Sequence, residues 1–119
     1  MPDVTILHNP NCSTSRHATD AAASNGVDVE VVQYLKAPPD RAALEAVIDR
    51  LEDPVADLVR KDGHFRDLGL DADDYVTSEA VIELLLEHPR LMQRPVLVRG
   101  ARAIIGRPKD RVEPFLRGD

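Results

Sequence analysis

The stretch HNPNCSTSR, residues 8–16, connects an apolar run to an Ala-rich segment and holds the only cysteine of the chain. Ahead of it, VTIL (4–7) is short, apolar and β-prone, which is typical of a strand. Behind it, residues 13–25 are rich in Ala and small polar residues and end at Gly26, which predicts a helix closed by a left-handed glycine. Residues 27–32, VDVEVV, alternate apolar and acidic residues and predict a second strand. The stretch therefore lies at the strand-to-helix corner of a β-α-β unit.

The middle of the chain is predicted to be a helical insert over about residues 40–90. Asp40 precedes apolar residues at helical spacing, Asp53-Pro54 restarts a helix as cap and first-turn proline, and a third helix begins near Thr77. The acidic run DADD (71–74) lacks the glycine and the distal glutamate of a calcium loop, so we interpret it as a solvated turn.

The end of the chain returns to strands. PVLV (95–98) and ARAII (101–105) are separated by Arg99-Gly100, which predicts a tight hairpin, and residues 108–116 predict a last short helix. The order is β-α-β, helical insert, β-β-α. It predicts a single α/β domain over residues 1–119, with the thioredoxin-like mixed sheet and helices inserted between its two halves.

The composition excludes several classes of partner. Fifteen Lys and Arg against 21 Asp and Glu give a formal net charge of −6, the opposite of the basic surface typical of proteins that bind nucleic acids or anionic membranes. No apolar run approaches the ~18 residues of a membrane span, and the first residues lack the pattern of a signal peptide. We therefore expect a cytoplasmic protein that binds neither nucleic acid nor membrane, and we expect a monomer.

Cys12 is placed where a thiol becomes acidic. It directly precedes the predicted helix, and the N-terminal N–H groups and dipole of a helix stabilise an anion by up to ~2 kcal/mol. The same N–H groups can bind an oxyanion, as can the nearby hydroxyl groups and one guanidinium. These candidate residues are Ser13, Thr14, Ser15 and Arg16. His8, four residues before the cysteine, is a candidate imidazolium beside the thiolate.

A lone cysteine has other interpretations. Most such residues are buried and inert, but the strand-to-helix corner with three hydroxyl residues favours a nucleophile. A phosphatase-type loop needs Arg where Ala18 stands, and a C-x-x-C redox pair needs Cys where Ser15 stands. One cysteine and scattered histidines have no recognised zinc-ligand spacing, so we expect no metal.

Five segments together resemble the glutaredoxin-dependent arsenate reductases of the thioredoxin-like superfamily, a family related to the Spx-like proteins. The segments are HNPNCSTSR (8–16), YLKAPPDRAAL (34–44), LVRKDGHFRDLGL (58–70), HPRLMQRPVLV (88–98) and GRP (106–108). The spacing of His8, Cys12 and Arg16 alone is a weak signal; five segments in the same order are a strong one.

The resemblance implies a role for each matching residue. Cys12 matches the nucleophile and His8 the residue that favours its thiolate. Arg60, Arg94 and Arg107 match the oxyanion-binding arginines. Without the resemblance, Arg60 would be a solvated residue on its helix and Arg107 a C-terminal cap on the hairpin, both at the surface. Arg94-Pro95 matches the cis peptide bond before the third strand; the alternative is a trans proline that opens an edge strand.

The resemblance also implies the reaction. The Cys12 thiolate attacks the arsenic of arsenate, and the arginines hold the adduct. Since the chain has no second cysteine, an external thiol must resolve this adduct. In the family, glutathione and glutaredoxin supply the thiols and no cofactor is bound. Two alternatives remain: an Spx-like regulator that binds RNA polymerase, which Ser15 disfavours, and a thiol oxidoreductase with another substrate.

Overall fold

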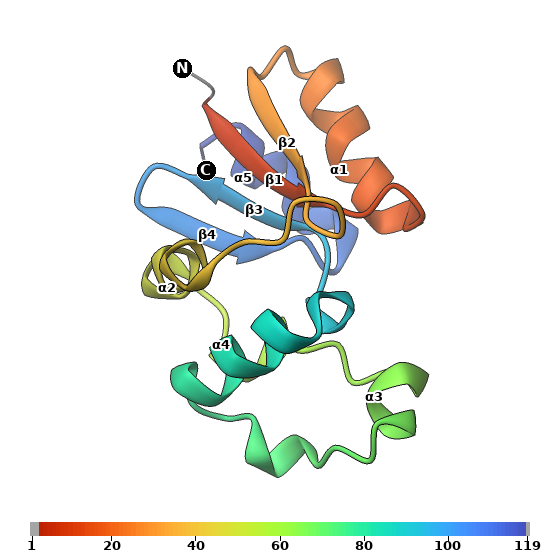
Figure 1. The fold of residues 1–119 in the computed structure, drawn as a ribbon. Coiled ribbons are helices and arrows are strands. Elements are labelled where there is room, and N and C mark those ends of the chain that lie inside the picture. The colour runs from red at the N-terminus through yellow and green to blue at the C-terminus, as the bar shows by residue number, and fades with distance from the viewer. Residues whose placement is uncertain (1–2, 119) are drawn as a thin grey trace.

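The computed structural model describes residues 3–118, and its elements follow the expected order (Figure 1). The helices and strands are β1 (Val4–His8), α1 (Ser13–Ser24), β2 (Val29–Gln33), α2 (Arg41–Arg50), the 3-10 turn η1 (Val55–Leu58), α3 (Gly63–Asp67), η2 (Ala72–Asp74), α4 (Ser78–Glu87), η3 (Pro89–Leu91), β3 (Val96–Arg99), β4 (Arg102–Ile105), η4 (Lys109–Arg111) and α5 (Val112–Leu116).

The strands of the described residues form one sheet in the order β2-β1-β3-β4. β1 and β2 are parallel and are joined by the α1 crossover, whereas β1 pairs with β3 and β3 with β4 antiparallel. The turn between β3 and β4 contains Gly100 at φ 57°, a left-handed conformation that favours glycine. The mixed α/β sheet and the hairpin predicted from the sequence are confirmed.

Each face of the sheet has its own core, because successive strand residues point to opposite faces. The register aligns Leu7, Val96 and Ile105, which face the helical insert, and it aligns Ile6 with Leu97, which face α1 and α5. α1 and α5 therefore pack on one face. The insert lies against the other face and extends past the end of the sheet (Figure 1).

The insert contains less regular helix than the sequence predicts. Asp40 caps α2 through Ala43 N at 2.9 Å, and Thr77 caps α4 through Ala80 N at 3.2 Å, as expected. The helix predicted after Asp53-Pro54 is wrong: only the 3-10 turn η1 forms there. The Asp53 carboxylate accepts a hydrogen bond from Ile105 N at 2.9 Å instead of capping a helix, and Val59 leaves the turn to form a bridge with Met92.

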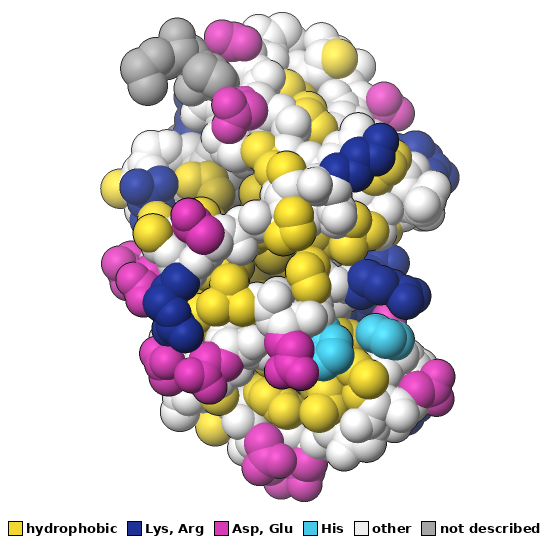
Figure 2. Space-filling model, in the orientation of Figure 1, with side chains coloured by type: hydrophobic (Ala, Val, Ile, Leu, Met, Phe, Trp, Pro, Cys, Tyr) yellow, Lys and Arg dark blue, Asp and Glu magenta, His cyan; other side chains and the backbone are white. Residues whose placement is uncertain are grey.

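Charged side chains are distributed unevenly over the surface. In Figure 2, acidic side chains gather mostly over the insert, whereas Lys and Arg lie on the flanks at mid-height. The acidic run 71–74 forms the mostly exposed turn η2, as expected. No helix in the described part of the chain has both the length and the apolar character needed to cross a membrane.

Candidate active site

Cys12 occupies the N-cap of α1, as the last residue of the four-residue loop that leaves β1. Its backbone is extended, with φ −107° and ψ 123°, and its carbonyl accepts the first helical hydrogen bond from Arg16 N at 2.9 Å. Its own N–H donates to Asn9 O at 3.1 Å, which tightens the loop. The residue is 8% exposed. The thiol therefore lies at a helix N-terminus, as predicted, and is mostly shielded from water.

Burial and hydrogen bonding act on the Cys12 thiol in opposite directions. Burial raises the pKa of the thiol, but the N–H groups of Ser15 and Thr14, a hydrogen bond from Arg94 and the charge of Arg107 lower it by more. The net pKa is below the ordinary value of a cysteine. A larger fraction of the side chain is therefore thiolate at neutral pH, the form that attacks an electrophile.

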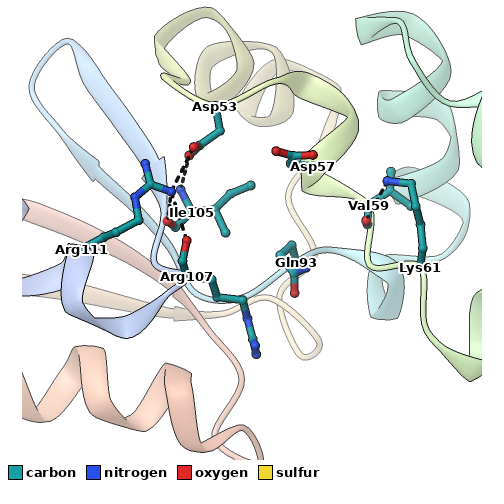
Figure 3. Close-up of a pocket in the computed structure, with 8 residues that line it drawn as sticks. All are labelled: Asp53, Asp57, Val59, Lys61, Gln93, Ile105, Arg107 and Arg111. Atoms are coloured by element: carbon teal, nitrogen blue, oxygen red, sulfur yellow. Dashed lines mark hydrogen bonds and ion pairs between the residues drawn. The ribbon is translucent and has the colours of Figure 1, made fainter.

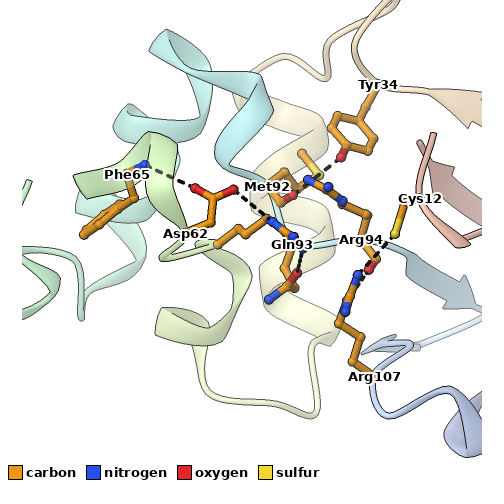
Figure 4. Close-up of polar contacts among 9 residues, drawn as sticks. Cys12, Tyr34, Asp62, Phe65, Met92, Gln93, Arg94 and Arg107 are labelled. Carbon is orange, nitrogen blue, oxygen red and sulfur yellow. Dashed lines mark hydrogen bonds and ion pairs between the residues drawn. The ribbon is translucent and has the colours of Figure 1, made fainter. Parts of the chain in front are cut away.

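Arg107 brings the C-terminal half of the chain to the sulfur. Its Nη2 donates to Cys12 Sγ at 3.2 Å, and its Nε donates to Arg94 O at 2.7 Å (Figure 4). The peptide bond between Arg94 and Pro95 is cis, as the resemblance implies. Arg94 Nε is buried and has no hydrogen-bond partner among the described residues. Two guanidinium groups thus converge on one thiol, and one of them still has an unused donor.

The loop is held by the fully buried Ser15. The Ser15 hydroxyl accepts a hydrogen bond from Asn9 N at 3.0 Å and is hydrogen-bonded to His8 Nδ1 at 2.6 Å. Burial and the charge of Arg16 lower the pKa of His8, which favours the neutral imidazole at pH 7. This arrangement differs from the expected imidazolium beside the thiolate. His8 contacts Ser15, and the Ser15 N–H contacts the sulfur, so Ser15 connects His8 to Cys12.

The four residues after Cys12, predicted to bind an oxyanion, are placed differently in the structure. The N–H groups of Thr14 and Ser15 point at the sulfur, and Ser13 is the exposed first residue of α1. Arg16 does not fit the prediction: its backbone N–H is used by Cys12 O, and its guanidinium donates to Pro10 O at 2.7 Å. Arg16 therefore closes the loop by its own contacts.

Arg60 lies on the insert side of the site. Its Nε donates to Asp62 Oδ2 at 3.0 Å, and its Nη1 donates to Gln93 Oε1 at 3.4 Å. Gln93 directly precedes Arg94 (Figure 4). The contacts of Arg60 therefore connect it to the loop that carries Arg94. In this structure the Arg60 guanidinium pairs with a carboxylate, and its partner is not the sulfur.

Three residues of the site were not singled out by the sequence analysis. Asp62 caps α3 through Phe65 N at 3.1 Å as well as pairing with Arg60, and Gln93 anchors the same guanidinium. Tyr34 is fully buried, and its hydroxyl donates weakly to Met92 O at 3.5 Å. Burial raises the pKa of Tyr34 in spite of the opposing charge of nearby Arg94, so the phenol stays protonated. The sequence around Asp62, Asp-Gly-His-Phe, has an N-cap residue that could have predicted a helix start. No local pattern in the sequence points to Gln93 or Tyr34.

Two pockets lie beside the arginines that act on the thiol. One, of about 330 Å³, includes Arg107 and is formed by η1, the segment after it and the β4–α5 connection (Figure 3). The other, of about 250 Å³, includes Arg94 together with Asn9, Asn11, Asp62 and Arg90. Among the residues described, no cluster of three or more His, Cys, Asp or Glu is placed to hold a metal ion. The arrangement combines a thiolate with anion-binding cations, which suits attack on a bound oxyanion.

Comparisons with known proteins match the whole chain. Residues 7–115 match the model of the ArsC family. The arsenate reductase of Neisseria meningitidis serogroup A is 36% identical over 98% of this chain and 100% of its own. The arsenate reductase of Rhizobium meliloti is 40% identical over 95% of this chain and 81% of its own. The solved structure of an arsenate reductase from Vibrio cholerae superposes with a TM-score of 0.81 at 30% identity, covering 93% of this chain and 95% of that one.

These likenesses extend from β1 to α5 and include both halves of the site, the Cys12 loop and the arginines that follow the insert. The structural similarity confirms the thioredoxin-like arrangement predicted from the order of the elements. Because the family match spans nearly all of the sequence and full-length relatives exceed 30% identity, this chain belongs to the ArsC family.

Proposed function

We propose that the protein reduces arsenate to arsenite in the cytoplasm, with Cys12 as nucleophile and an external thiol of the glutathione and glutaredoxin type as reductant. The observation that carries the proposal is the hydrogen bond from Arg107 Nη2 to Cys12 Sγ at 3.2 Å. It joins a thiol of lowered pKa to a guanidinium able to bind two oxygens of an oxyanion. The relatives from Neisseria meningitidis and Rhizobium meliloti are arsenate reductases, which supports arsenate as the oxyanion.

The first step uses the groups around the sulfur. Arsenate binds against the guanidinium groups of Arg94 and Arg107, and Arg60 joins them when it leaves Asp62. The Cys12 thiolate attacks arsenic, and one arsenate oxygen leaves as water after taking up protons. The buried Nε of Arg94, which has no partner among the described residues, supplies a donor for an adduct oxygen.

The second step needs a thiol from outside the chain, because Cys12 is the only cysteine. An external thiolate attacks the Cys12 sulfur, a sulfur–sulfur bond forms, and the sulfur–arsenic bond breaks with its electron pair on arsenic. Arsenic passes from As(V) to As(III) and leaves as arsenite, while the two thiols become a mixed disulfide. A further thiol, such as glutaredoxin, reduces this disulfide and restores Cys12. The reducing cytoplasm supplies such thiols.

The test is arsenite formation in a single turnover. Wild type and Cys12→Ser are compared with glutathione, 2-mercaptoethanol and dithiothreitol, each with and without glutaredoxin. Arsenite from the wild type alone supports the proposal, and the most effective donor identifies the thiol class. No arsenite with any donor, from a protein whose Cys12 still alkylates rapidly at pH 7, would assign the thiol to another substrate or to a regulatory partner.

A further inference from the structure

Tyr34 is the largest fully buried side chain among the described residues, and it directly follows β2. β2 pairs with β1 in parallel, and the register ends with His8 opposite Gln33, so Tyr34 comes next to the loop that begins at Asn9. Its ring packs in the core between the sheet and the insert, which also contains Met92. The side chain therefore reaches both segments that surround the thiol, the loop after β1 and the segment before β3.

The Tyr34 hydroxyl has partners in both of these segments. Its O–H donates to Met92 O at 3.5 Å, and its oxygen is turned toward Arg94 and accepts a hydrogen bond from that side chain (Figure 4). The oxygen also accepts from the Asn9 side chain. Asn9 Oδ1 already accepts from Asn11 N at 2.9 Å, which leaves the amide N–H groups of Asn9 as the donors. The phenol thus uses its one donor and its acceptor capacity in full.

Arg94 depends on neutral partners for its position. Arg60 is paired with the carboxylate of Asp62 at 3.0 Å, but within residues 3–118 the Arg94 guanidinium forms no ion pair with a carboxylate. It donates to the Tyr34 oxygen on one side and to the Cys12 sulfur on the other. The tyrosine hydroxyl therefore lies directly behind a cation that acts on the nucleophile.

We propose that Tyr34 is a positioning residue for the reaction of Cys12: its hydroxyl oxygen accepts from the Arg94 guanidinium and thereby holds this cation beside the sulfur. A long arginine side chain has many rotamers, and a fixed acceptor selects the one that faces the thiolate. The link from this thiolate to arsenate rests on the proposed function, whereas the positioning of Arg94 does not.

A neutral hydroxyl suits this role better than a carboxylate. Burial raises the pKa of Tyr34, so the phenol stays protonated and fixes Arg94 without cancelling its positive charge. Phenylalanine would fill nearly the same volume and would bury no polar group. Because the donated hydrogen bond to Met92 O is long, at 3.5 Å, we expect the hydroxyl to add little to stability. Its effect is expected on the sulfur, through Arg94.

Tyr34→Phe tests the proposal, because it keeps the ring and removes only the hydroxyl. The alkylation rate of Cys12 with iodoacetamide is measured from about pH 5 to about pH 10 in the wild type and the variant. At pH 6 we expect the rate to fall roughly three- to tenfold, while the plateau at high pH is not lowered, since only the thiolate fraction changes. Arg107 and the N–H groups at the start of α1 still act on the sulfur, so the loss is partial.

Tyr75→Phe is the matched control. Tyr75 is the other tyrosine of the chain, and it packs edge-on against Phe65 with ring centroids 6.0 Å apart, away from Cys12. Its variant is expected to keep the alkylation profile of the wild type. An unchanged profile in Tyr34→Phe, or the same loss in Tyr75→Phe, would overturn the proposal. A loss of stability in urea without a change in alkylation would overturn it as well, since packing alone gives that result.

A double-mutant cycle tests whether Tyr34 acts through Arg94. In an Arg94→Ala background, Tyr34→Phe is expected to change the alkylation rate at pH 6 by at most about twofold, because the group that it positions is gone. Equal effects of Tyr34→Phe in both backgrounds would contradict the proposed connection.

Arsenate turnover separates this proposal from the proposed function. In an enzyme that forms arsenite, kcat/KM for arsenate at pH 6 is expected to fall roughly three- to tenfold in Tyr34→Phe, and an unchanged value would overturn the role of Tyr34 in the reaction. Absence of arsenite from the wild type would overturn the proposed function, and the alkylation profiles would still decide whether Tyr34 positions Arg94.

Discussion

The guanidinium of Arg107 contacts both the nucleophile and the backbone of the loop that faces it. Replacing Arg107 by Ala removes a charge-assisted hydrogen bond to the sulfur and a contact for the oxyanion. We expect kcat/KM for arsenate to fall roughly ten- to a hundredfold, from a loss of about 1.5–3 kcal/mol. The pKa of Cys12 rises at the same time, which a pH titration of thiolate absorbance at 240 nm measures.

Arg60→Ala is the matched comparison for this prediction. The Arg60 guanidinium contacts Asp62 and Gln93, so its removal is expected to weaken arsenate binding while the titration of Cys12 stays that of the wild type. Equal shifts in the thiol titration of both variants would show that the contact to Arg107 is not what acidifies the thiol. Unchanged arsenate affinity in both would remove the arginines from the substrate site.

The lowered pKa of Cys12 links stability to pH. Burial opposes ionisation of this thiol, but the Ser15 N–H and the two arginines outweigh it, so the folded-state pKa lies below the unfolded value of about 8.5. The folded state therefore holds fewer protons between the two pKa values. The stabilisation of the folded state by the ionised Cys12 thiol is fully present above pH ~8.5 and is lost as the pH falls through the folded pKa.

Cys12→Ser is the reference for this linkage. We expect the unfolding free energy of the wild type, relative to that of Cys12→Ser, to increase as the pH rises from 6 to 9 in urea titrations. A difference that is flat with pH would mean that the folded and unfolded thiols have the same pKa.

At the scale of elements, β4 ends in a close packing contact that positions Arg107. A Cβ on Gly106 would lie 2.8 Å from Pro95 Cγ and 2.9 Å from Leu97 Cδ1; Pro95 directly precedes β3, Leu97 lies within it, and both are buried. We expect Gly106→Ala to lower the unfolding free energy by about 1–3 kcal/mol through overpacking and to slow arsenate turnover because Arg107 is displaced. Gly63→Ala is the control, since its nearest new contact is Arg66 Nη2 at 3.8 Å. Equal stability of the two variants in urea would contradict this packing.

Asp62 joins two elements, because it caps α3 and holds Arg60. Asn also caps helices well, so Asp62→Asn is expected to keep α3 while it releases the Arg60 guanidinium for the oxyanion. The KM for arsenate should then fall by a few-fold. Asp62→Ala also loses the cap and is expected to cost about 1 kcal/mol of stability, measured by urea unfolding. A KM in Asp62→Asn that equals that of the wild type would show that Asp62 does not compete with the substrate.

The elements that local signals specify were predictable from the sequence. The caps Asp40 and Thr77 and the hairpin glycine Gly100 act within a few residues of themselves, and each is where the pattern placed it. The helix expected after Asp53-Pro54 failed because the Asp53 carboxylate bonds to Ile105, 52 residues away in sequence. A cap signal does not reveal a competing partner so far along the chain.

At the scale of the whole molecule, the residues of the site could be predicted from the sequence, but the contacts among them could not. The resemblance pointed to Cys12, Arg94 and Arg107, and the structure brings these three together. The carboxylate that holds Arg60 is local, because Asp62 lies two residues away, whereas the contact of Arg60 with Gln93 and the lining of the pocket beside Arg107 bring together residues far apart in the sequence. Long-range contacts of this kind have no periodic pattern along the chain.

The monomeric state remains a prediction, and the dimensions of the single chain allow it to be tested in solution. The Cα atoms have a radius of gyration of 13.7 Å and extents of 42 × 26 × 24 Å. Small-angle scattering of a monomer is expected to give a radius close to this value, and light scattering a mass near 13.1 kDa. A mass twice as large, stable on dilution, would contradict the monomer.

The separation in sequence between Cys12 and Arg107 has a consequence for synthesis on the ribosome. The nucleophile leaves the exit tunnel among the first residues, but the guanidinium that contacts it comes 95 positions later, two residues after the end of β4. The strand next to β1 in that part of the sheet, β3, is also made late. Chains emerge N-terminus first, so Arg107 cannot act on the nascent Cys12 until almost the whole polypeptide has been translated. The part of the acidification that comes from Arg94 and Arg107 therefore arises only when the C-terminal strands join β1.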